Sequence, residues 1–176
     1  IESERRGYAL ELAVDFVRMK QEREHFWNID TTKPVTSIPL QTLNEVATSW
    51  PEGDIALRIG DYMMRPHQRW TITPVPDAGG TLTGPYCKIL IEGTTRALAA
   101  TANLELTTVP AFIGSDEQLW RIEQLTDGTY RIMPKAIPGQ EGLNTKYVLY
   151  SIADSTPTLA EYDFNTDNSK WNLRSH

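Results

Sequence analysis

Tryptophan recurs along this sequence at nearly regular intervals, and each of four copies is followed two residues later by isoleucine or leucine. These copies are Trp27, Trp70, Trp120 and Trp171, so successive copies are 43, 50 and 51 residues apart. Because alternate residues of a strand face the same side, Trp-x-Ile/Leu predicts a strand that turns both apolar side chains toward one core. A period of this length is typical of a repeat architecture, and the sequence therefore predicts three structural units of about fifty residues.

Glutamine stands two residues before the tryptophan in two of these copies, Gln68-Arg69-Trp70 and Gln118-Leu119-Trp120, whereas the last copy reads Ser169-Lys170-Trp171. Two glycine-led stretches also correspond, residues 84–89 and residues 128–132. The second stretch begins with the glycine of an Asp-Gly pair flanked by alternating apolar residues, which is a hairpin signal. We therefore expect an all-β fold with about four short strands in each unit.

The first unit is less regular than the other two. Residues 35–43 form one possible strand, and residues 54–59 alternate apolar and polar side chains more clearly. Residues 1–24 fit either a helix face or an alternating strand, and they carry too much apolar surface for a disordered tail. We expect an N-terminal extension over residues 1–24 that packs on the domain of residues 25–176, or on a neighbouring domain or protein.

Three units of short strands, each with a Gln-x-Trp-like strand near its end, resemble the ricin-type lectin family over residues 25–176. The resemblance implies a β-trefoil of three repeats of about fifty residues, preceded by the N-terminal extension. It also implies shallow sugar pockets, one per repeat, each formed by an aspartate, a stacking aromatic side chain and an amide. The expected function is that of a non-catalytic, lectin-like carbohydrate-binding module, with a glycan or polysaccharide as its partner.

The third unit fits the family's pocket best. Asp154 is followed by Tyr162, Asn165 and Asn168, in the order in which the family's carboxylate, aromatic and amide occur. In such a pocket the carboxylate would accept hydrogen bonds from sugar hydroxyl groups, the ring would cover the apolar side of the sugar, and the amide would fix its orientation. These four residues are the predicted ligand-binding residues. Two of them have another interpretation, because Asp154 is also a typical turn residue and Tyr162 is equally consistent with a core position.

The other two units match the pocket less well. In the second unit Leu98 is followed by Ala99 and Ala100, which supply no carboxylate, so we expect no working pocket there. The first unit offers Asp61 and Tyr62, but its register is too irregular to give either residue a role.

Charge and residue content exclude several other functions. The net charge is -6 and no run of Lys or Arg offers the basic face that nucleic acid requires. The single cysteine, Cys87, permits neither an internal disulfide nor a multi-cysteine zinc site. His25, His67 and His176 lack metalloprotease spacing, and neither a Gly-x-Ser-x-Gly elbow nor a phosphate-binding loop occurs. We expect no enzyme activity, catalytic residue, metal or cofactor, although carboxylate spacing alone does not exclude a glycosidase pair.

Apolar stretches of a few residues are much shorter than the roughly 20 needed to cross a bilayer, so we expect no membrane span. The sequence begins at Ile1 rather than Met, which suggests a trimmed leader and a secreted, periplasmic or cell-surface protein. Two other binding functions stay open. A β-trefoil protease inhibitor would present residues 74–84 or 134–145 as a loop, and a structural protein-interaction module would use the apolar surface of residues 8–19.

Overall fold

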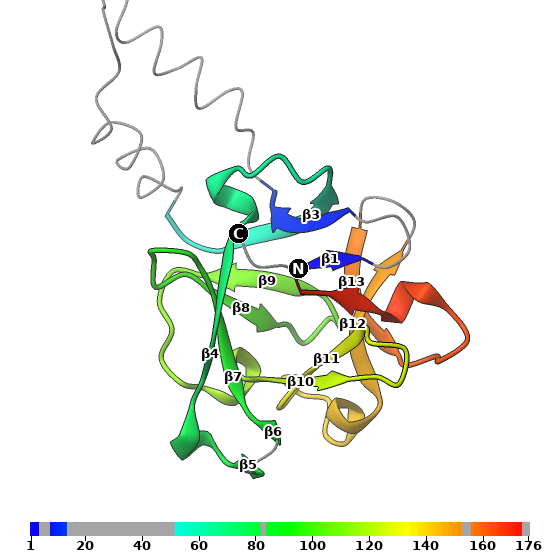
Figure 1. The fold of residues 1–176 in the computed structure, drawn as a ribbon. Helices are drawn as coiled ribbons and strands as arrows, with labels where there is room; N and C mark the ends of the chain where they lie inside the picture. The colour runs from blue at the N-terminus through cyan, green and yellow to red at the C-terminus, as the bar shows by residue number, and fades with distance from the viewer. Residues whose placement is uncertain (4–7, 14–51, 82–83, 153–155, 174–176) are drawn as a thin grey trace, which may run out of the picture.

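Short strands make up most of the regular structure in the computed structural model, which describes residues 1–3, 8–13, 52–81, 84–152 and 156–173 (Figure 1). The strands are β1 (Glu2–Ser3), β2 (Ala9–Leu12), β3 (Ile55–Gly60), β4 (Trp70–Pro74), β5 (Gly80–Thr81), β6 (Gly84–Pro85), β7 (Cys87–Ile91), β8 (Ala97–Ala100), β9 (Leu106–Val109), β10 (Trp120–Gln124), β11 (Tyr130–Pro134), β12 (Tyr147–Ile152), β13 (Thr156–Glu161) and β14 (Trp171–Asn172). Between them lie the 3-10 turns η1 (Pro66–Gln68), η2 (Pro76–Ala78), η3 (Asp116–Gln118), η4 (Leu143–Thr145) and η5 (Asp167–Ser169). These ranges contain no α-helix, so the predicted all-β fold is confirmed for them.

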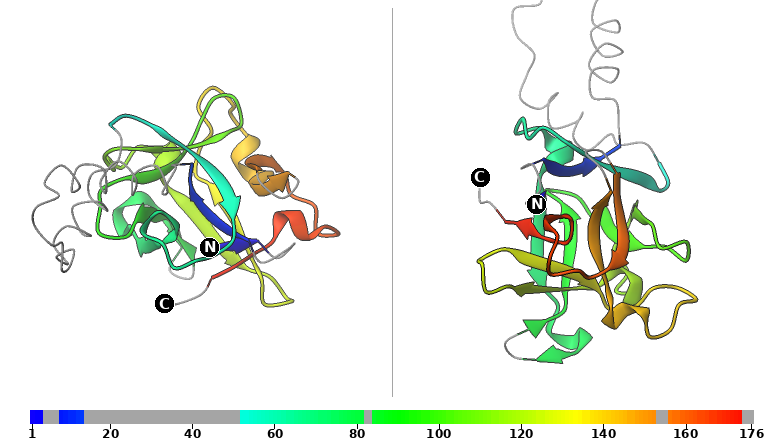
Figure 2. Two further views of the ribbon diagram at one scale, coloured as in Figure 1. Left: turned by 90° about the horizontal axis from the view of Figure 1, so that it is seen from above. Right: turned by 90° about the vertical axis from the view of Figure 1, so that its right-hand side faces the viewer.

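Most strands belong to one antiparallel sheet that curls into a barrel-like ring (Figures 1 and 2). Its order is β10-β11-β14-β1-β2-β3-β9-β8-β7-β4, and a further pairing of β10 with β7 joins the ring. The closing pair gives β10 a neighbour on both sides, whereas β4 pairs only with β7 and stays at an edge of the described sheet. The β12–β13 hairpin forms a separate sheet beside the ring, and a hydrogen bond from Leu159 N to Leu104 O connects the two.

Three buried tryptophans lie in the core, each held by the same kind of hydrogen bond. The indole N–H of Trp70 donates to the carbonyl of Leu10 at 2.8 Å. Trp120 donates to the carbonyl of Leu98, and Trp171 to that of Leu149, both at 2.9 Å. A buried indole nitrogen needs such a partner, because an unmet donor would cost about 1–3 kcal/mol. Around the rings pack other buried side chains, among them Leu12, Ile59, Ile89, Ile91, Ile132 and Leu159.

The residue two positions before each tryptophan fixes the loop that leads into the strand. The Oε1 atoms of Gln68 and Gln118 each accept a hydrogen bond at 2.8 Å, from the backbone N–H of Met63 and Ile113 respectively. The shorter Ser169 side chain accepts from the backbone N–H of the nearby Asp163 at 3.3 Å. Each of these residues also ends a 3-10 turn, so Gln-x-Trp marks a fixed turn followed by a core tryptophan.

The N-terminal segment contributes strands to the main sheet. β2 is a fully buried strand that pairs with β3, with Leu10 opposite Ile59, and β1 pairs with β14. Of the two conformations left open for this segment, the strand is therefore found at Ala9–Leu12. Residues 14–24 lie outside the described residues, so the expected boundary between residues 24 and 25 stays a prediction.

Other expected elements appear where the structure describes them. The alternating stretch at residues 54–59 corresponds to β3, and β10 and β11 form the expected hairpin. Gly128 in its turn has φ +89°, a conformation that favours glycine. The Trp27 copy and the possible strand at residues 35–43 lie outside the described residues. In the described ranges, no helix has the length and apolarity required to span a bilayer.

Candidate functional site

The structure places three of the four predicted ligand-binding residues in or beside the turn that precedes β14. Tyr162 follows the end of β13 and is half-buried, Asn165 is exposed, and Asn168 lies in η5. Asp154 lies outside the described residues. The Asn168 side chain donates from Nδ2 to the hydroxyl of Tyr150 at 3.2 Å, which joins η5 to β12. We call these two residues the Tyr150–Asn168 pair.

Tyr162 is covered on one side. The Arg131 guanidinium lies over the Tyr162 ring, 5.0 Å from the centroid. The backbone N–H of Tyr162 donates to the carbonyl of Lys146 at 2.9 Å. Its hydroxyl is buried and has no hydrogen-bond partner among the described residues. Tyr162 therefore packs against β11, and the Arg131 side chain covers one face of its ring.

Phe164 is the exposed aromatic side chain of this loop, and sequence analysis missed it. The residue is 52% exposed, and Lys170 Nζ lies 4.5 Å from the ring centroid. It stands seven residues before Trp171. Met63 and Ile113 stand seven residues before Trp70 and Trp120, and both are exposed. An apolar residue at this fixed distance before the tryptophan is the sequence signal that would have found Phe164.

Charged side chains near these aromatic rings are already paired. Lys170 Nζ contacts Asp127 Oδ2 at 3.0 Å, and Arg131 contacts the carboxylate of Glu123 through two nitrogen atoms. Hydrogen bonds from the side chain and backbone of Thr129, joined by that of Lys170, lower the pKa of Asp127 to about 2. The hydrogen bond to Asp127 in turn raises the pKa of Lys170. Both cations are thus largely neutralised by a carboxylate partner.

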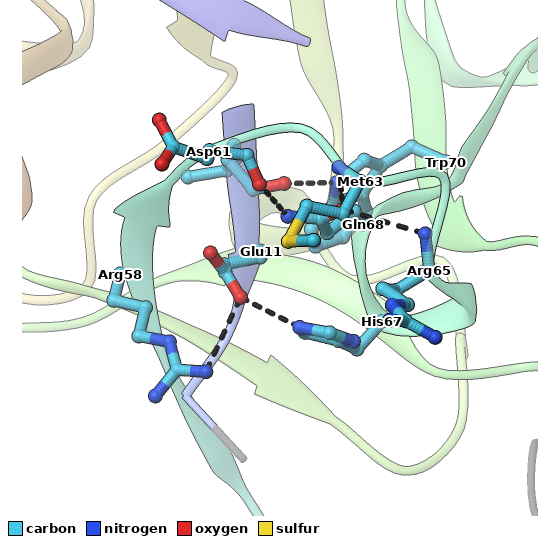
Figure 3. A network of polar contacts seen from close by, with 9 residues as sticks. Glu11, Arg58, Asp61, Met63, Arg65, His67, Gln68 and Trp70 are labelled. Atoms are coloured by element: carbon cyan, nitrogen blue, oxygen red, sulfur yellow. Dashed lines mark hydrogen bonds and ion pairs between the residues drawn. The ribbon is translucent and has the colours of Figure 1, made fainter. Parts of the chain in front are cut away.

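The positions of the Tyr150–Asn168 pair have counterparts elsewhere in the fold. Tyr150 directly follows Leu149, whose carbonyl accepts from Trp171, and Asn168 stands three residues before that tryptophan. The corresponding residues next to Leu10 and Trp70 are Glu11 and His67. They form a hydrogen bond of 2.6 Å between Nε2 and Oε2 (Figure 3). Next to Leu98 and Trp120 the corresponding residues are Ala99, which has no polar side-chain atom, and Glu117.

Glu11, Arg58 and His67 form a closed ionic group, which we call the Glu11 cluster (Figure 3). Glu11 and His67 are each 4% exposed, and Arg58 contacts Glu11 Oε2 at 3.3 Å. Burial by itself raises the pKa of Glu11. The hydrogen bond from His67 and the charges of His67 and Arg58 outweigh burial and hold that pKa below its ordinary value of 4.5.

The backbone also closes around this carboxylate. Glu11 Oε1 lies so close to Gly60 that a Cβ atom at that position would come within 2.0 Å of it. Gly60 is opposite Ala9 in the β2–β3 pairing, so the missing side chain makes room for Glu11 on the neighbouring strand. The carboxylate is therefore enclosed by its own chain.

Sequence analysis missed the Glu11 cluster because Glu11 was assigned to the extension. Leu10 and Trp70 are 60 residues apart, whereas the other two leucine–tryptophan pairs are 22 residues apart. Asp61 and Tyr62, the candidates named for the first unit, lie in the loop that Gln68 holds. The Asp61 carbonyl accepts from Gln68 Nε2 at 2.6 Å, and the Asp61 side chain is exposed.

A metal centre is not found in the part of the chain that the structure describes. No group of three or more His, Cys, Asp or Glu side chains there could hold a metal ion. Cys87 is buried, its Sγ contacts the carbonyl of Pro85 at 3.7 Å, and burial raises the pKa of its thiol. Cys87 is thus a buried residue of β7, and the raised pKa leaves its thiol a poor nucleophile.

Comparison with solved structures supports the fold. The chain is similar to a mosquitocidal holotoxin, with a TM-score of 0.55 and 17% identity over 70% of this chain, and it spans only 14% of that toxin chain. It is also similar to the designed 3-fold symmetric protein ThreeFoil, with a TM-score of 0.52 and 20% identity over 72% of this chain and 84% of that one. No protein-family model matches the sequence, and a search of curated proteins gives no match. At these identities the likeness concerns the fold alone, which is β-trefoil-like.

Proposed function

We propose that this chain is a non-catalytic carbohydrate-binding module of a secreted or cell-surface protein, built as a β-trefoil of three repeats. The three indole-to-leucine hydrogen bonds and the three turns that precede them support the repeats. The proposed sugar site is the Tyr150–Asn168 pair together with Phe164, which lies in the loop that leads into η5. The single observation that carries the proposal is the part-buried hydrogen bond between the Asn168 amide and the Tyr150 hydroxyl of β12, at a loop whose Phe164 is 52% exposed.

The side chains of this site suit a sugar. The Asn168 amide and the Tyr150 hydroxyl can each donate and accept hydrogen bonds, as sugar hydroxyl groups do. The open part of the Phe164 ring offers an apolar surface to the C–H face of a pyranose. We expect Asn165 to line the edge of the site and Tyr162 to support it from beneath Arg131. Asp154 stays the expected carboxylate acceptor.

The affinity of such a site is expected to be low. Few direct hydrogen bonds and one aromatic surface give a dissociation constant of about 1 mM, equivalent to about -4 kcal/mol. Attachment to a larger protein or assembly with further sites would raise the overall avidity by a factor of about 10²–10⁴. A weak single site is therefore compatible with a useful function in a multivalent context.

Binding to a glycan array tests this proposal directly. The purified chain is compared with Asn168→Ala, which removes the amide, and with Asn103→Ala, an exposed asparagine in the turn between β8 and β9. The expected result is binding by the unmodified chain and by the Asn103 variant, with loss of binding by the Asn168 variant. Circular dichroism confirms that both variants are folded. Absence of binding by the unmodified chain to any glycan would overturn the proposal.

One observation favours a second candidate, a module that presents a loop to a protein such as a protease. The β5–β6 projection is held at its base, because Val75 N donates to Tyr86 O at 2.8 Å and Lys135 Nζ donates to Ala78 O at 2.7 Å. The Lys135 ammonium also lies over the Tyr86 ring. A loop whose base is fixed in this way loses little conformational entropy when it binds in the groove of a partner protein. Inhibition of a panel of proteases by the chain, without sugar, would favour this candidate.

A further inference from the structure

We infer that the edge of β4 beside Trp70 is a docking site for one extended peptide segment, which continues β1 on the amino-terminal side of Ile1 and carries a cation next to Ile1. The inference is independent of carbohydrate binding. It starts from the correspondence of the three strands that hold the core tryptophans, β4, β10 and β14.

Two of these three strands have a strand neighbour on both sides. β10 pairs with β11 and also with β7, where Trp120 is opposite Cys87. β14 pairs with β1 and also with β11, where Trp171 is opposite Tyr130. Among the described strands β4 pairs with β7 alone, so its side away from β7 has no strand beside Trp70.

The exposure of the tryptophans agrees with this difference. Trp70 is 9% exposed, whereas Trp120 and Trp171 are 0% exposed. A strand edge offers backbone N–H and carbonyl groups to an added strand, and the uncovered part of Trp70 offers apolar surface at the same place. The edge of β4 therefore has the two features by which a peptide is bound as an extra strand.

The register of β1 identifies the strand that belongs beside β4. The residues opposite the tryptophans in the pairs β4–β7, β10–β11 and β14–β1 are Ile91, Pro134 and Ser3, so these three residues correspond. Cys87 stands four residues before Ile91, and Tyr130 stands four residues before Pro134. These are the two residues that pair with the other side of β10 and β14. The counterpart for β4 therefore lies four residues before Ser3.

That position is two residues on the amino-terminal side of Ile1. Ile1 itself corresponds to Ile89 and Ile132, which are core residues with 0% exposure, whereas Ile1 is half-buried. β1 and β14 share two residue pairs, whereas β4–β7 and β10–β11 share five pairs each. A segment that continues β1 past Ile1 would therefore bring its second residue opposite Trp70 and cover both side chains.

A cation is expected directly before Ile1, because its counterparts in the other two repeats are Lys88 and Arg131. Lys88 Nζ lies 5.4 Å from the centroid of the Phe112 ring, and the Arg131 guanidinium lies 5.0 Å from that of Tyr162. Each ring belongs to the loop that leads to the tryptophan strand of the same repeat.

Tyr62 is the corresponding aromatic residue of the first repeat. It stands eight residues before Trp70, as Phe112 stands before Trp120, and it is half-buried. A cation next to Ile1 would lie over this ring and gain a cation–π contact, which contributes more where water is partly excluded. The segment therefore has a defined chemistry, with an apolar or aromatic residue opposite Trp70 followed by Lys or Arg.

The small size of the site decides whether the segment is a separate peptide. In the corresponding strands, a single residue pair joins β7 to β10 and another joins β11 to β14. So few hydrogen bonds do not offset the translational and rotational freedom that a separate peptide loses on binding. A segment joined to Ile1 avoids most of this loss, since its effective concentration is at about the millimolar level or higher. The occupant is therefore polypeptide that is covalently continuous with β1.

Extending the chain tests the inference. The tripeptide Thr-Tyr-Arg, which copies residues 129–131 and their place before Ile132, is joined to Ile1. Thr-Pro-Arg is the matched control, since proline cannot donate a ladder hydrogen bond, and Thr-Tyr-Glu reverses the charge. Free Thr-Tyr-Arg amide at about 1 mM is added to the unmodified chain as the separate peptide. Urea unfolding measures stability. The solvent isotope shift of 5-fluorotryptophan ¹⁹F signals, assigned by single Trp→Phe variants, measures the exposure of each indole.

Among the three core tryptophans of the unmodified chain, we expect a solvent isotope shift for Trp70 alone. Joined Thr-Tyr-Arg should remove most of that shift and lower the unfolding equilibrium constant by about tenfold, as one or two added hydrogen bonds would. Thr-Pro-Arg should change this constant by less than about twofold. Thr-Tyr-Glu should stabilise the chain less than Thr-Tyr-Arg does, and the free peptide should have no effect.

The opposite results would overturn the inference. An unmodified chain without an isotope shift at Trp70 would show that the edge of β4 is already covered. Equal stabilisation by Thr-Tyr-Arg and Thr-Pro-Arg would show that the added residues do not pair beside Trp70. An equal effect of the free peptide would show that a separate partner occupies the site. Equal stabilisation by Thr-Tyr-Arg and Thr-Tyr-Glu would refute the placement of a cation over Tyr62.

Discussion

The Glu11 cluster and the Tyr150–Asn168 pair occupy matched positions of the same fold, yet their physical environments are opposite. The first is ionic and enclosed, with Glu11 and His67 each 4% exposed. The second is neutral and partly open, with one hydrogen bond of 3.2 Å between side chains. A buried charge must keep its partners, whereas an uncharged amide at the surface can exchange one partner for a ligand. The comparison teaches that corresponding positions of one fold can hold a buried ion pair in one place and a partly exposed, uncharged hydrogen bond in another.

Removal of the Glu11 carboxylate should give the largest effect. Glu11→Ala leaves His67 and Arg58 without their common partner, so the free energy of unfolding should fall by about 3 kcal/mol. Asn168→Ala should lower it by less than about 1 kcal/mol, because its hydrogen bond is partly exposed. Urea unfolding followed by tryptophan fluorescence measures both.

Asp61→Ala is the matched control for Glu11→Ala, because its carboxylate lies close in sequence to Arg58 but is exposed. Its effect should stay within about 0.5 kcal/mol. Equal destabilisation by Glu11→Ala and Asn168→Ala would contradict the division of the two sites into structural and binding roles.

Gly60→Ala tests the enclosure of the same carboxylate. The new Cβ would lie 2.0 Å from Glu11 Oε1, so the side chain must shift and the free energy of unfolding should fall by about 2 kcal/mol. In a Glu11→Ala background the obstruction is gone, and the same substitution should cost much less. A double-mutant cycle from four unfolding curves gives the coupling. Additive effects would show that Gly60 is required for a reason other than Glu11.

Stability should fall at acidic pH as two carboxylates, those of Glu11 and Asp127, become protonated. The pKa of Glu11 is below 4.5 in the fold, so its charge stabilises the folded state above pH 4.5 and this contribution is lost as pH falls through the lowered pKa. For Asp127 the loss should extend from pH 3.8 down to about 2. Glu11→Gln and Asp127→Asn should each flatten the stability curve in the corresponding window. Urea midpoints across pH measure this, and a curve that neither substitution alters would refute the assignment.

Met64→Gly should give the smallest effect, in the loop that Gln68 holds. Met64 has φ +58°, which costs a residue with a side chain about 1 kcal/mol, so glycine should stabilise the fold by about 0.5 kcal/mol after its greater unfolded-state entropy is included. Met63→Gly, at a neighbouring exposed residue, is the control and should be slightly destabilising. Thermal unfolding detects both, and a loss of stability in Met64→Gly would show that the Met64 side chain makes a favourable contact.

The parts of the fold that could be predicted are those written in local sequence. Trp120 with its preceding glutamine, the Asp-Gly hairpin and the alternating strand at residues 54–59 depend on neighbours within a few positions, and the structure contains all three. Asn168 was named as a candidate from its order after Asp154 and Tyr162, which follows the pattern of the resembling family, and the structure joins it to Tyr150 by a hydrogen bond. Tyr162 was named by the same reasoning, but the contact that covers its ring comes from Arg131, which is remote in sequence.

By itself, the sequence determined a predominantly β chain with tryptophan strands at a regular period, because side-chain alternation and turn residues act over short distances. Only the tertiary structure decided that Leu10 accepts from Trp70 and that Glu11 meets His67, since 60 and 56 residues separate these partners. The same geometry encloses a carboxylate beside Gly60 and leaves an amide open beside Tyr150, and solvent exposure is a property of the whole fold that no local pattern contains.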